Sequence, residues 1–146
     1  MNRESLKALL IKHEGLRLKP YVDTRGNATI GVGRNLADVG ISPQEANYLL
    51  DNDLSRVVAQ CRLEFPWFNA LCDTRQNVIS SMVFNLGIKK FKGFVNLLEA
   101  IKMKDFETAA NEMLMSAWSA QVGARALELT NMMQNGDPYP LEQSND

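Results

Sequence analysis

Residues 14–33 read EGLRLKPYVDTRGNATIGVG and differ in pattern from the rest of the chain. A turn cluster at residues 24–27 lies between segments that favour extended backbone, and Pro20, Gly31 and Gly33 interrupt any helical spacing. This pattern predicts two or three short strands joined by tight turns. Since no other region has it, we expect one small antiparallel β subdomain, at about residues 15–40.

Helical spacing surrounds this region on both sides. Residues 5–13 are amphipathic and Gly15 can end them as a helix. Ser42-Pro43-Gln44-Glu45 forms a capping box with Pro at the first helical position, which predicts a long helix over residues 43–62. Its apolar positions, expected to be buried, are Ala46, Leu49, Leu50, Leu54, Val57 and Val58.

Later segments repeat this helical logic. Asp73 is predicted to cap a helix over residues 73–86 that stops at Gly87, and more helices are predicted at residues 94–102, 105–115 and 123–134. The predicted fold is therefore α+β and mostly helical, in a single domain over residues 1–146. Residues 1–14 and 41–135 would form its helical subdomain, and residues 136–146 a loosely held tail.

Composition excludes several classes of protein. The chain has 146 residues, of which 45% are apolar and 23% charged, as in one ordinary globular domain. Sixteen basic against seventeen acidic residues give a net charge of −1, so no overall field attracts nucleic acid or membrane. Residues 1–34 carry seven basic and three acidic residues. An anionic polymer would bind best there, although an unevenly charged surface explains the same numbers.

Few residues are suited to metal binding or export. Cys61, Cys72 and the single histidine, His13, offer too few ligands for a zinc site, so we expect no metal. The two cysteines are expected to be free, mostly buried thiols rather than a disulfide. His13 is expected to be an exposed residue at a helix end, with proton shuttling as the alternative. No segment has the pattern of a membrane anchor or a signal peptide.

Two carboxylates lie nine residues apart in and beside the β-like region. Glu14 follows the first helix, Asp23 precedes a turn, and Thr29 comes six residues later. Hydrolysis of a sugar bond needs one protonated carboxyl to donate to the leaving oxygen and one ionised carboxylate to activate water. Spacing alone is weak support, because two solvated surface acids would look the same.

The residues around these acids add a resemblance. Residues 14–33 closely resemble the glutamate, aspartate and threonine segment of phage-type lysozymes, the T-even endolysin-like muramidases of glycoside hydrolase family 24. Weaker matches continue through residues 41–46, 82–87 and 92–94. They include Asp53 and end with Trp118, Gln121 and Arg125, so the resemblance spans about residues 3–135.

This resemblance implies a muramidase that hydrolyses the β-1,4 bond between N-acetylmuramic acid and N-acetylglucosamine of peptidoglycan without a cofactor. It implies that Glu14 is the general acid, Asp23 the partner carboxylate and Thr29 the residue that positions water, with an inverting outcome. Phe84 and Asn85 fall where members of the family contact the sugar chain. For Phe84, packing in the core is an equal alternative.

Three positions need separate interpretation. Arg34 stands where many relatives have a histidine that is paired with an acid matching Asp53, so we predict an ion pair between Arg34 and Asp53. Arg125 aligns with an arginine that reaches the catalytic glutamate. Only six residues separate Arg34 from Ile41, which predicts a shorter edge beside the sugar-binding groove.

Alternatives to hydrolysis remain open from the sequence. A peptidoglycan-binding module without catalysis and a lytic transglycosylase would share the fold. The expected partner is the glycan strand of peptidoglycan, and we expect a monomer with no nucleic acid and no direct membrane anchor. An endolysin of this kind would wait in the host cytoplasm until a holin-like protein opens its way to the periplasm and cell wall. A prophage remnant or a secreted antibacterial effector would have the same sequence features.

Overall fold

The computed structural model describes residues 1–137 of the chain. Its contacts divide the chain into two compact units, Met1–Leu49 and Leu50–Asp146. Most residues are helical and the sheet is small and antiparallel, which confirms the predicted α+β class. The predicted loose tail falls almost wholly on residues 138–146, which lie outside the described part.

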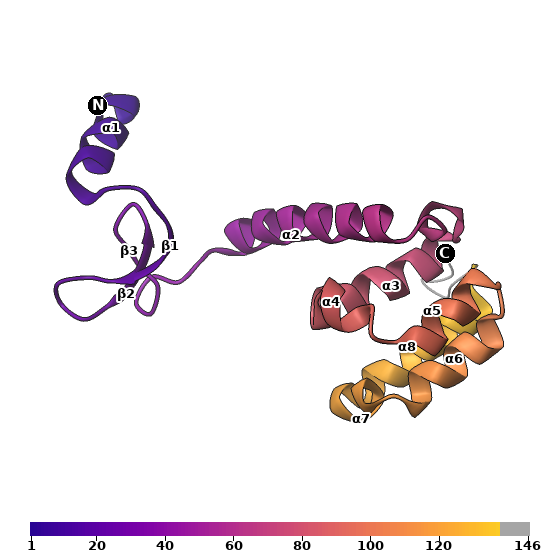
Figure 1. Ribbon diagram of the computed structural model, residues 1–146. Helices are drawn as coiled ribbons and strands as arrows, with labels where there is room; N and C mark the ends of the chain where they lie inside the picture. Colours follow the sequence, from indigo (N-terminus) through magenta and orange to yellow (C-terminus); the bar gives the residue numbers. More distant parts are fainter. Residues whose placement is uncertain (138–146) are drawn as a thin grey trace, which may run out of the picture. The chain divides into compact units, whose positions relative to one another are not determined.

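The first unit contains one helix followed by a three-stranded sheet (Figure 1). Its elements are α1 (Arg3–Glu14), β1 (Arg17–Val22), β2 (Ala28–Gly31) and β3 (Arg34–Asn35), with strand order β1-β2-β3. The side chain of Asn2 accepts a hydrogen bond from the backbone N–H of Ser5, 3.0 Å away, and so caps α1. Gly15 ends α1 with a φ of +79°, a conformation that glycine adopts at little cost. The predicted β subdomain is confirmed.

Strand β2 lies at the centre of this sheet. Thr29 pairs with Tyr21 of β1 on one side and with Asn35 of β3 on the other. The register of β1 is irregular between Arg17 and Tyr21, where Pro20 has no N–H to donate. Thr29 is only 2% exposed, so the central strand holds its hydroxyl away from bulk solvent.

A tight turn follows β3 in place of a longer connection. The backbone N–H of Val39 donates to the carbonyl of Asn35, and that of Gly40 donates to Leu36. The side chain of Asn35 also accepts from the N–H of Asp38, at 3.0 Å. This segment contains no helix, in keeping with the short edge that the sequence predicts.

Helix α2 (Pro43–Glu64) begins with the predicted capping box. The N–H of Glu45 donates to Oγ of Ser42 at 3.1 Å, and the N–H of Ser42 donates to Oε1 of Glu45 at 2.8 Å. These reciprocal bonds satisfy backbone donors that a helix N-terminus otherwise leaves unpaired. Burial along α2 differs from the prediction, because Leu49, Leu50 and Leu54 are 40–50% exposed. Only later positions reach the packed core: Val57 and Cys61 are buried in it, and Val58 is partly buried against it.

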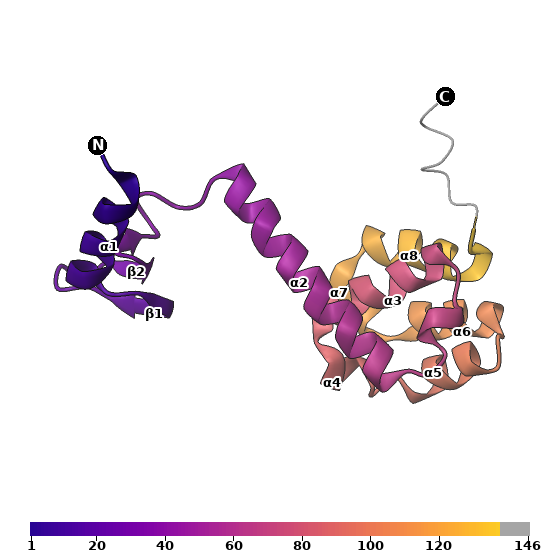
Figure 2. The same cartoon turned by 90° about the horizontal axis from the view of Figure 1, so that it is seen from above.

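The second unit is helical throughout its described part. After α2 come η1 (Phe68–Ala70), α3 (Asp73–Leu86), α4 (Ile88–Phe91), α5 (Val95–Lys102), α6 (Phe106–Met115), α7 (Ala117–Val122) and α8 (Ala124–Asn135). In Figures 1 and 2, α6 lies beside α5 and α8. The longer helices confirm the predicted ones to within about two residues. The three short elements were not predicted, because a single turn carries little periodicity.

A continuous apolar core holds this unit together. Phe65, Phe68, Val78, Ile79, Met82, Phe91, Ile101, Met113 and Met133 are among its buried members. Trp118 is 3% exposed and belongs to the same core. The ring of Phe65 stacks on Trp67 and meets Phe91 edge to face, so aromatic contacts join the loop after α2 to α4.

The cap of α3 differs from the prediction. Cys72, not Asp73, occupies the N-cap position, and its side chain makes no capping bond. Asp137 serves instead, since its Oδ1 accepts from the backbone N–H of Thr74 at 3.1 Å and from the Thr74 hydroxyl. In return, Arg75 donates to the carbonyl oxygens of Met133 and Gln134 at the end of α8. A tertiary contact thus replaces the local cap.

Candidate active site

Glu14 is the last residue of α1, and its side chain reaches the turn between β2 and β3. A Cβ atom placed on Gly33 would lie 3.1 Å from Oε2 of Glu14 and 3.4 Å from its Cδ. Gly33 also has a φ of +64°. Glycine at this position therefore allows both the turn and the close approach of the carboxylate.

Asp23 sits at the start of the turn between β1 and β2, with its carboxylate held by backbone donors. Its Oδ1 accepts from the N–H of Asn27 at 2.8 Å and from the N–H of Arg25 at 2.9 Å. The amide of Asn27 also lies 3.4 Å from Oδ2. These bonds, first of all that from the Asn27 N–H, lower the pKa of Asp23, and the Arg25 charge adds to the effect. Asp23 is consequently ionised at neutral pH.

Thr29 lies six residues after Asp23, on the other side of the turn, in β2. Its Oγ1 donates a hydrogen bond to the carbonyl oxygen of Asn27 at 2.8 Å. The hydroxyl proton is committed to this bond, so its oxygen can meet a further group only as an acceptor.

The central strand orders these three residues. Asp23 is hydrogen bonded to Asn27 directly before β2, Thr29 lies within β2, and Glu14 lies against Gly33 just after β2. Glu14, Asp23 and Thr29 therefore all belong to the first unit and attach to successive points along one strand.

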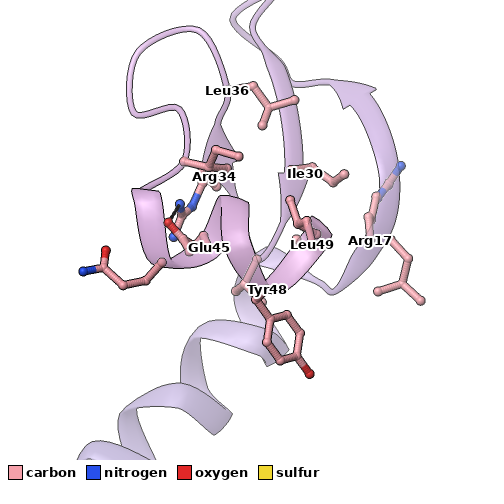
Figure 3. Close-up of a pocket in the computed structure, with 12 residues that line it drawn as sticks. Arg17, Ile30, Arg34, Leu36, Glu45, Tyr48 and Leu49 are labelled. Atoms are coloured by element: carbon pink, nitrogen blue, oxygen red, sulfur yellow. Dashed lines mark hydrogen bonds and ion pairs between the residues drawn. The ribbon is translucent and has the colours of Figure 1, made fainter. Parts of the chain in front are cut away.

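Arg34 has a different partner from the one predicted. Its Nη1 donates to Oε1 of Glu45 at 2.7 Å and to the carbonyl of Gly40 at 3.1 Å, as Figure 3 shows for the ion pair. Asp53 pairs instead with Arg56, three residues along α2. The prediction of an Arg34–Asp53 pair is thus wrong, because Glu45 at the start of α2 is presented to Arg34 by the short preceding turn.

The hydrogen bond from Arg34 lowers the pKa of Glu45 to about 2, with the backbone N–H of Ser42 acting in the same direction. One carboxylate therefore completes the capping box and also ties β3 to the start of α2. Because both side chains of the pair are more than a third exposed, water screens much of their attraction.

A pocket of about 880 Å³ lies beside this ion pair (Figure 3). Apolar side chains line it, among them Ile30, Leu36 and Leu49. Successive side chains of a strand point to opposite faces. Since Ile30 lines the pocket, Thr29 faces the other side of the sheet, and the pocket is separate from the three candidate catalytic residues.

The remaining candidate residues belong to the second unit. Phe84 and Asn85 are exposed positions near the end of α3, and Arg125 is an exposed position in the first turn of α8. Phe84 is 50% exposed and is not part of the described core, so the alternative that it packs there is not supported. The predicted binding role of Phe84 and Asn85 and the predicted link from Arg125 to Glu14 stay predictions.

Other groups with reactive side chains are separate from this site. Cys61 is buried and Cys72 half-buried, both as free thiols, and His13 is exposed in the last turn of α1. Within residues 1–137, no three His, Cys, Asp or Glu side chains are grouped so that they could hold a metal ion. Among the helices of those residues, none has the length and apolar character to cross a bilayer.

The chain combines helices with a small antiparallel sheet, and Glu14 ends α1 while Asp23 and Thr29 lie on the hairpin that follows. The family model described as phage lysozyme matches residues 11–134, and the chain belongs to this family. The resemblance seen in residues 14–33 is thereby confirmed. Membership supports lysozyme or endolysin activity, that is, hydrolysis of peptidoglycan.

Individual relatives agree with this assignment. The pre-baseplate central spike protein of Enterobacteria phage T4 is 27% identical over 91% of this chain and 28% of its own length. The probable T4-type lysozyme 2 of Dictyostelium discoideum is 26% identical over 90% of this chain and 95% of its own. An endolysin of Acyrthosiphon pisum secondary endosymbiont phage 1 is 30% identical, with 86% of each chain covered. The chain thus spans little more than a quarter of the spike protein and most of the other two.

Sequence reasoning missed three residues of this region: Asn27, Gly33 and Glu45. The sequence analysis used Gly33 only as a residue that interrupts helical spacing, and Glu45 only as part of a helix cap. The Asn-containing turn gave no signal of a contact with Asp23, because the bond depends on how the turn closes.

Proposed function

We propose that this chain is an endolysin-type muramidase that hydrolyses the β-1,4 bond between N-acetylmuramic acid and N-acetylglucosamine in peptidoglycan. The observation that carries the proposal is the placement of Glu14 at the end of α1 and of Asp23 and Thr29 on the hairpin that follows, in a chain that belongs to the phage lysozyme family. Acid–base hydrolysis of this bond uses side chains and water alone.

Glu14 is proposed as the general acid. In that role it carries a proton when substrate binds and gives it to the oxygen of the leaving sugar. Its position at the end of α1, against the glycine turn at Gly33, supports this role because no Cβ atom there restricts the carboxylate. The carboxyl group needs this space to come within hydrogen-bond distance of the leaving oxygen.

Asp23 is proposed as the partner carboxylate. The backbone donors at Arg25 and Asn27 keep it ionised, which is what a base or a stabiliser of an oxocarbenium-like centre requires. Two acids with unequal environments can divide the acid and base roles between them.

Thr29 is proposed to position the attacking water. Its committed proton leaves lone pairs that accept a hydrogen bond from water. With 2% of the residue exposed, a water molecule on Oγ1 would be held individually rather than exchanged freely with bulk solvent.

We propose an inverting outcome, as the resemblance of residues 14–33 to the phage-type lysozymes implies. An inverting pair of acids leaves space for a water molecule between the substrate and the partner carboxylate.

Residues outside the segment of the three candidate catalytic residues are proposed to contribute to substrate binding. Phe84 and Asn85 would contact the sugar chain, and Arg125 would have a supporting role. Murein is anionic, and Arg17, Lys19 and Arg25 are exposed basic residues of the first unit, so they are proposed to attract it. Cell lysis after release from the host cytoplasm, as a monomer, is the proposed biological setting.

Clearing of purified peptidoglycan by wild type and by Glu14→Gln tests the proposal. The amide keeps the size of the side chain but supplies no acidic proton, so we expect a loss of about 10²–10⁴-fold. Glu4→Gln changes the same charge on the same helix and should clear at the wild-type rate. Equal clearing by wild type and Glu14→Gln would contradict the acid role.

The products distinguish the alternatives. Mass analysis should find new reducing ends if water is the nucleophile. Anhydromuramic ends would indicate a lytic transglycosylase instead, and intact polymer with retained protein would indicate a binding module. Proton NMR of a short glycan, taken within the first turnovers, should show the α anomer of the new end if the reaction inverts.

A further inference from the structure

One residue of the first unit contacts both Asp23 and Thr29 and has no part in the reaction proposed above. Asn27 closes the turn between β1 and β2, where its carbonyl oxygen accepts from the backbone N–H of Asp23 at 2.9 Å. Gly26, with a φ of +83°, provides the left-handed residue that the turn needs. Asp23 and Asn27 therefore face each other across the turn.

The two oxygens of the Asp23 carboxylate are held unequally. Oδ1 accepts from two backbone N–H groups, those of Arg25 and Asn27, at 2.9 and 2.8 Å. Oδ2 accepts from Nδ2 of Asn27 at 3.4 Å, a longer and weaker bond. Oδ2 is thus the oxygen with capacity left for a water molecule or a sugar.

The backbone carbonyl oxygen of Asn27 also accepts a hydrogen bond from the Thr29 hydroxyl, at 2.8 Å. Asn27 thereby orients Oδ2 of Asp23 and also leaves the hydroxyl oxygen of Thr29 to act as a hydrogen-bond acceptor. Both groups hydrogen bond to the same residue of one closed turn, which sets their relative positions before substrate binds. Preorganisation of this kind lowers the cost of reaching the transition state.

We propose that Asn27 is a positioning residue of this active site: its side-chain amide orients Oδ2 of Asp23, and its carbonyl keeps Thr29 as a hydrogen-bond acceptor. This inference rests on the proposed muramidase function for its catalytic consequence. Asn27 is not itself proposed to contact the sugar or the attacking water; it acts through its two neighbours.

Two substitutions remove the amide donor in different ways. Asn27→Ala deletes the side chain. Asn27→Asp keeps its shape and its preference for turns, so it serves if the alanine variant does not fold. Asn47→Asp, at an exposed position of α2 in the same unit, is the matched control for the added charge.

We expect Asn27→Ala to lower kcat about three- to tenfold with KM unchanged. The acid limb of the pH profile should move to higher pH, because Asp23 loses a donor that favours its ionised form. Arg25, the charged neighbour on the same turn, stays in place in every variant. Asn27→Asp should shift the limb further, since it adds a like charge, and Asn47→Asp should match wild type in both quantities.

A carbon NMR titration of the Asp23 carboxyl gives a second measurement that needs no activity. Its midpoint should rise in both Asn27 variants and stay unchanged in Asn47→Asp. An unchanged midpoint together with wild-type kcat and pH profile would overturn the inference. A wild-type protein that releases no new ends from peptidoglycan would overturn the proposed function instead, while the titration still decides whether Asn27 controls Asp23.

Discussion

Oε2 of Glu14 lies 3.1 Å from the point where a Cβ atom of residue 33 would stand, so the carboxylate rests directly on the Gly33 turn. Gly31, at the other end of the same turn, also has a positive φ, but a Cβ atom there would meet nothing within 4 Å. The two glycines share one conformational demand, and only Gly33 contacts the proposed acid.

Comparing alanine variants of the two glycines therefore separates the effect of backbone strain from the effect of moving the Glu14 carboxylate. Gly33→Ala and Gly31→Ala should each lose about 1 kcal/mol of stability, because alanine is disfavoured at positive φ. Only Gly33→Ala should also push the carboxylate of Glu14 aside, and we expect it to clear peptidoglycan at least tenfold more slowly than Gly31→Ala. Urea unfolding and clearing rates measured on both variants check this, and equal rates would contradict it.

The ion pair between Arg34 and Glu45 predicts a pH dependence of stability. The pKa of Glu45 falls from 4.5 to about 2 on folding, so its contribution is present above pH 4.5 and is lost as the pH falls toward 2. Glu45→Gln should therefore melt at a lower temperature than wild type at neutral pH, with the difference shrinking between pH 4.5 and 2.

Thermal melts across this range, with Glu4→Gln as the control for an exposed pair, measure the effect. Both partners are more than a third exposed, so the difference in melting temperature should be small. A difference that stays constant down to pH 2 would show that the carboxylate charge is not its source.

The contact between Asp137 and α3 predicts the effect of removing one hydroxyl. Thr74→Val keeps the shape of a buried side chain but deletes its bond to Asp137, which should cost about 1 kcal/mol. Thr24→Val, at an exposed position of the first unit, should cost much less. Denaturant unfolding compares them, and equal midpoints would mean that the bond from the Thr74 hydroxyl to Asp137 does not stabilise the fold.

The two thiols should differ in reactivity. Burial raises the pKa of Cys61 to about 11, whereas Cys72 is half-buried at the start of α3. Because the thiolate is the reactive form, iodoacetamide should label Cys72 first in the native protein. Peptide mapping over time, with Cys72→Ser as the control, follows this, and equal labelling rates in the folded protein would contradict it.

The elements that the sequence predicted well depend on neighbours in the chain. The strands of residues 17–35 follow from turn residues and β-favouring side chains, and the start of α2 follows from the reciprocal bonds of Ser42 and Glu45. The sequence-based predictions were wrong where a group distant in the sequence replaced the expected local contact. Asp73 was expected to cap α3, but Asp137, 63 residues from Thr74, accepts from its N–H.

The candidate site shows the same difference between residues that the sequence predicts and contacts that depend on the folded chain. Residues 14–33 alone predict Glu14, Asp23 and Thr29 as candidate catalytic residues, because these side chains and their order occur in one continuous segment of sequence. The partner of Arg34, the contact of Glu14 with Gly33 and the bonds from Asn27 to Asp23 required the folded chain. A hydrogen bond depends on distance and direction to within a few tenths of an ångström, and those quantities exist only after turns have closed and strands have paired.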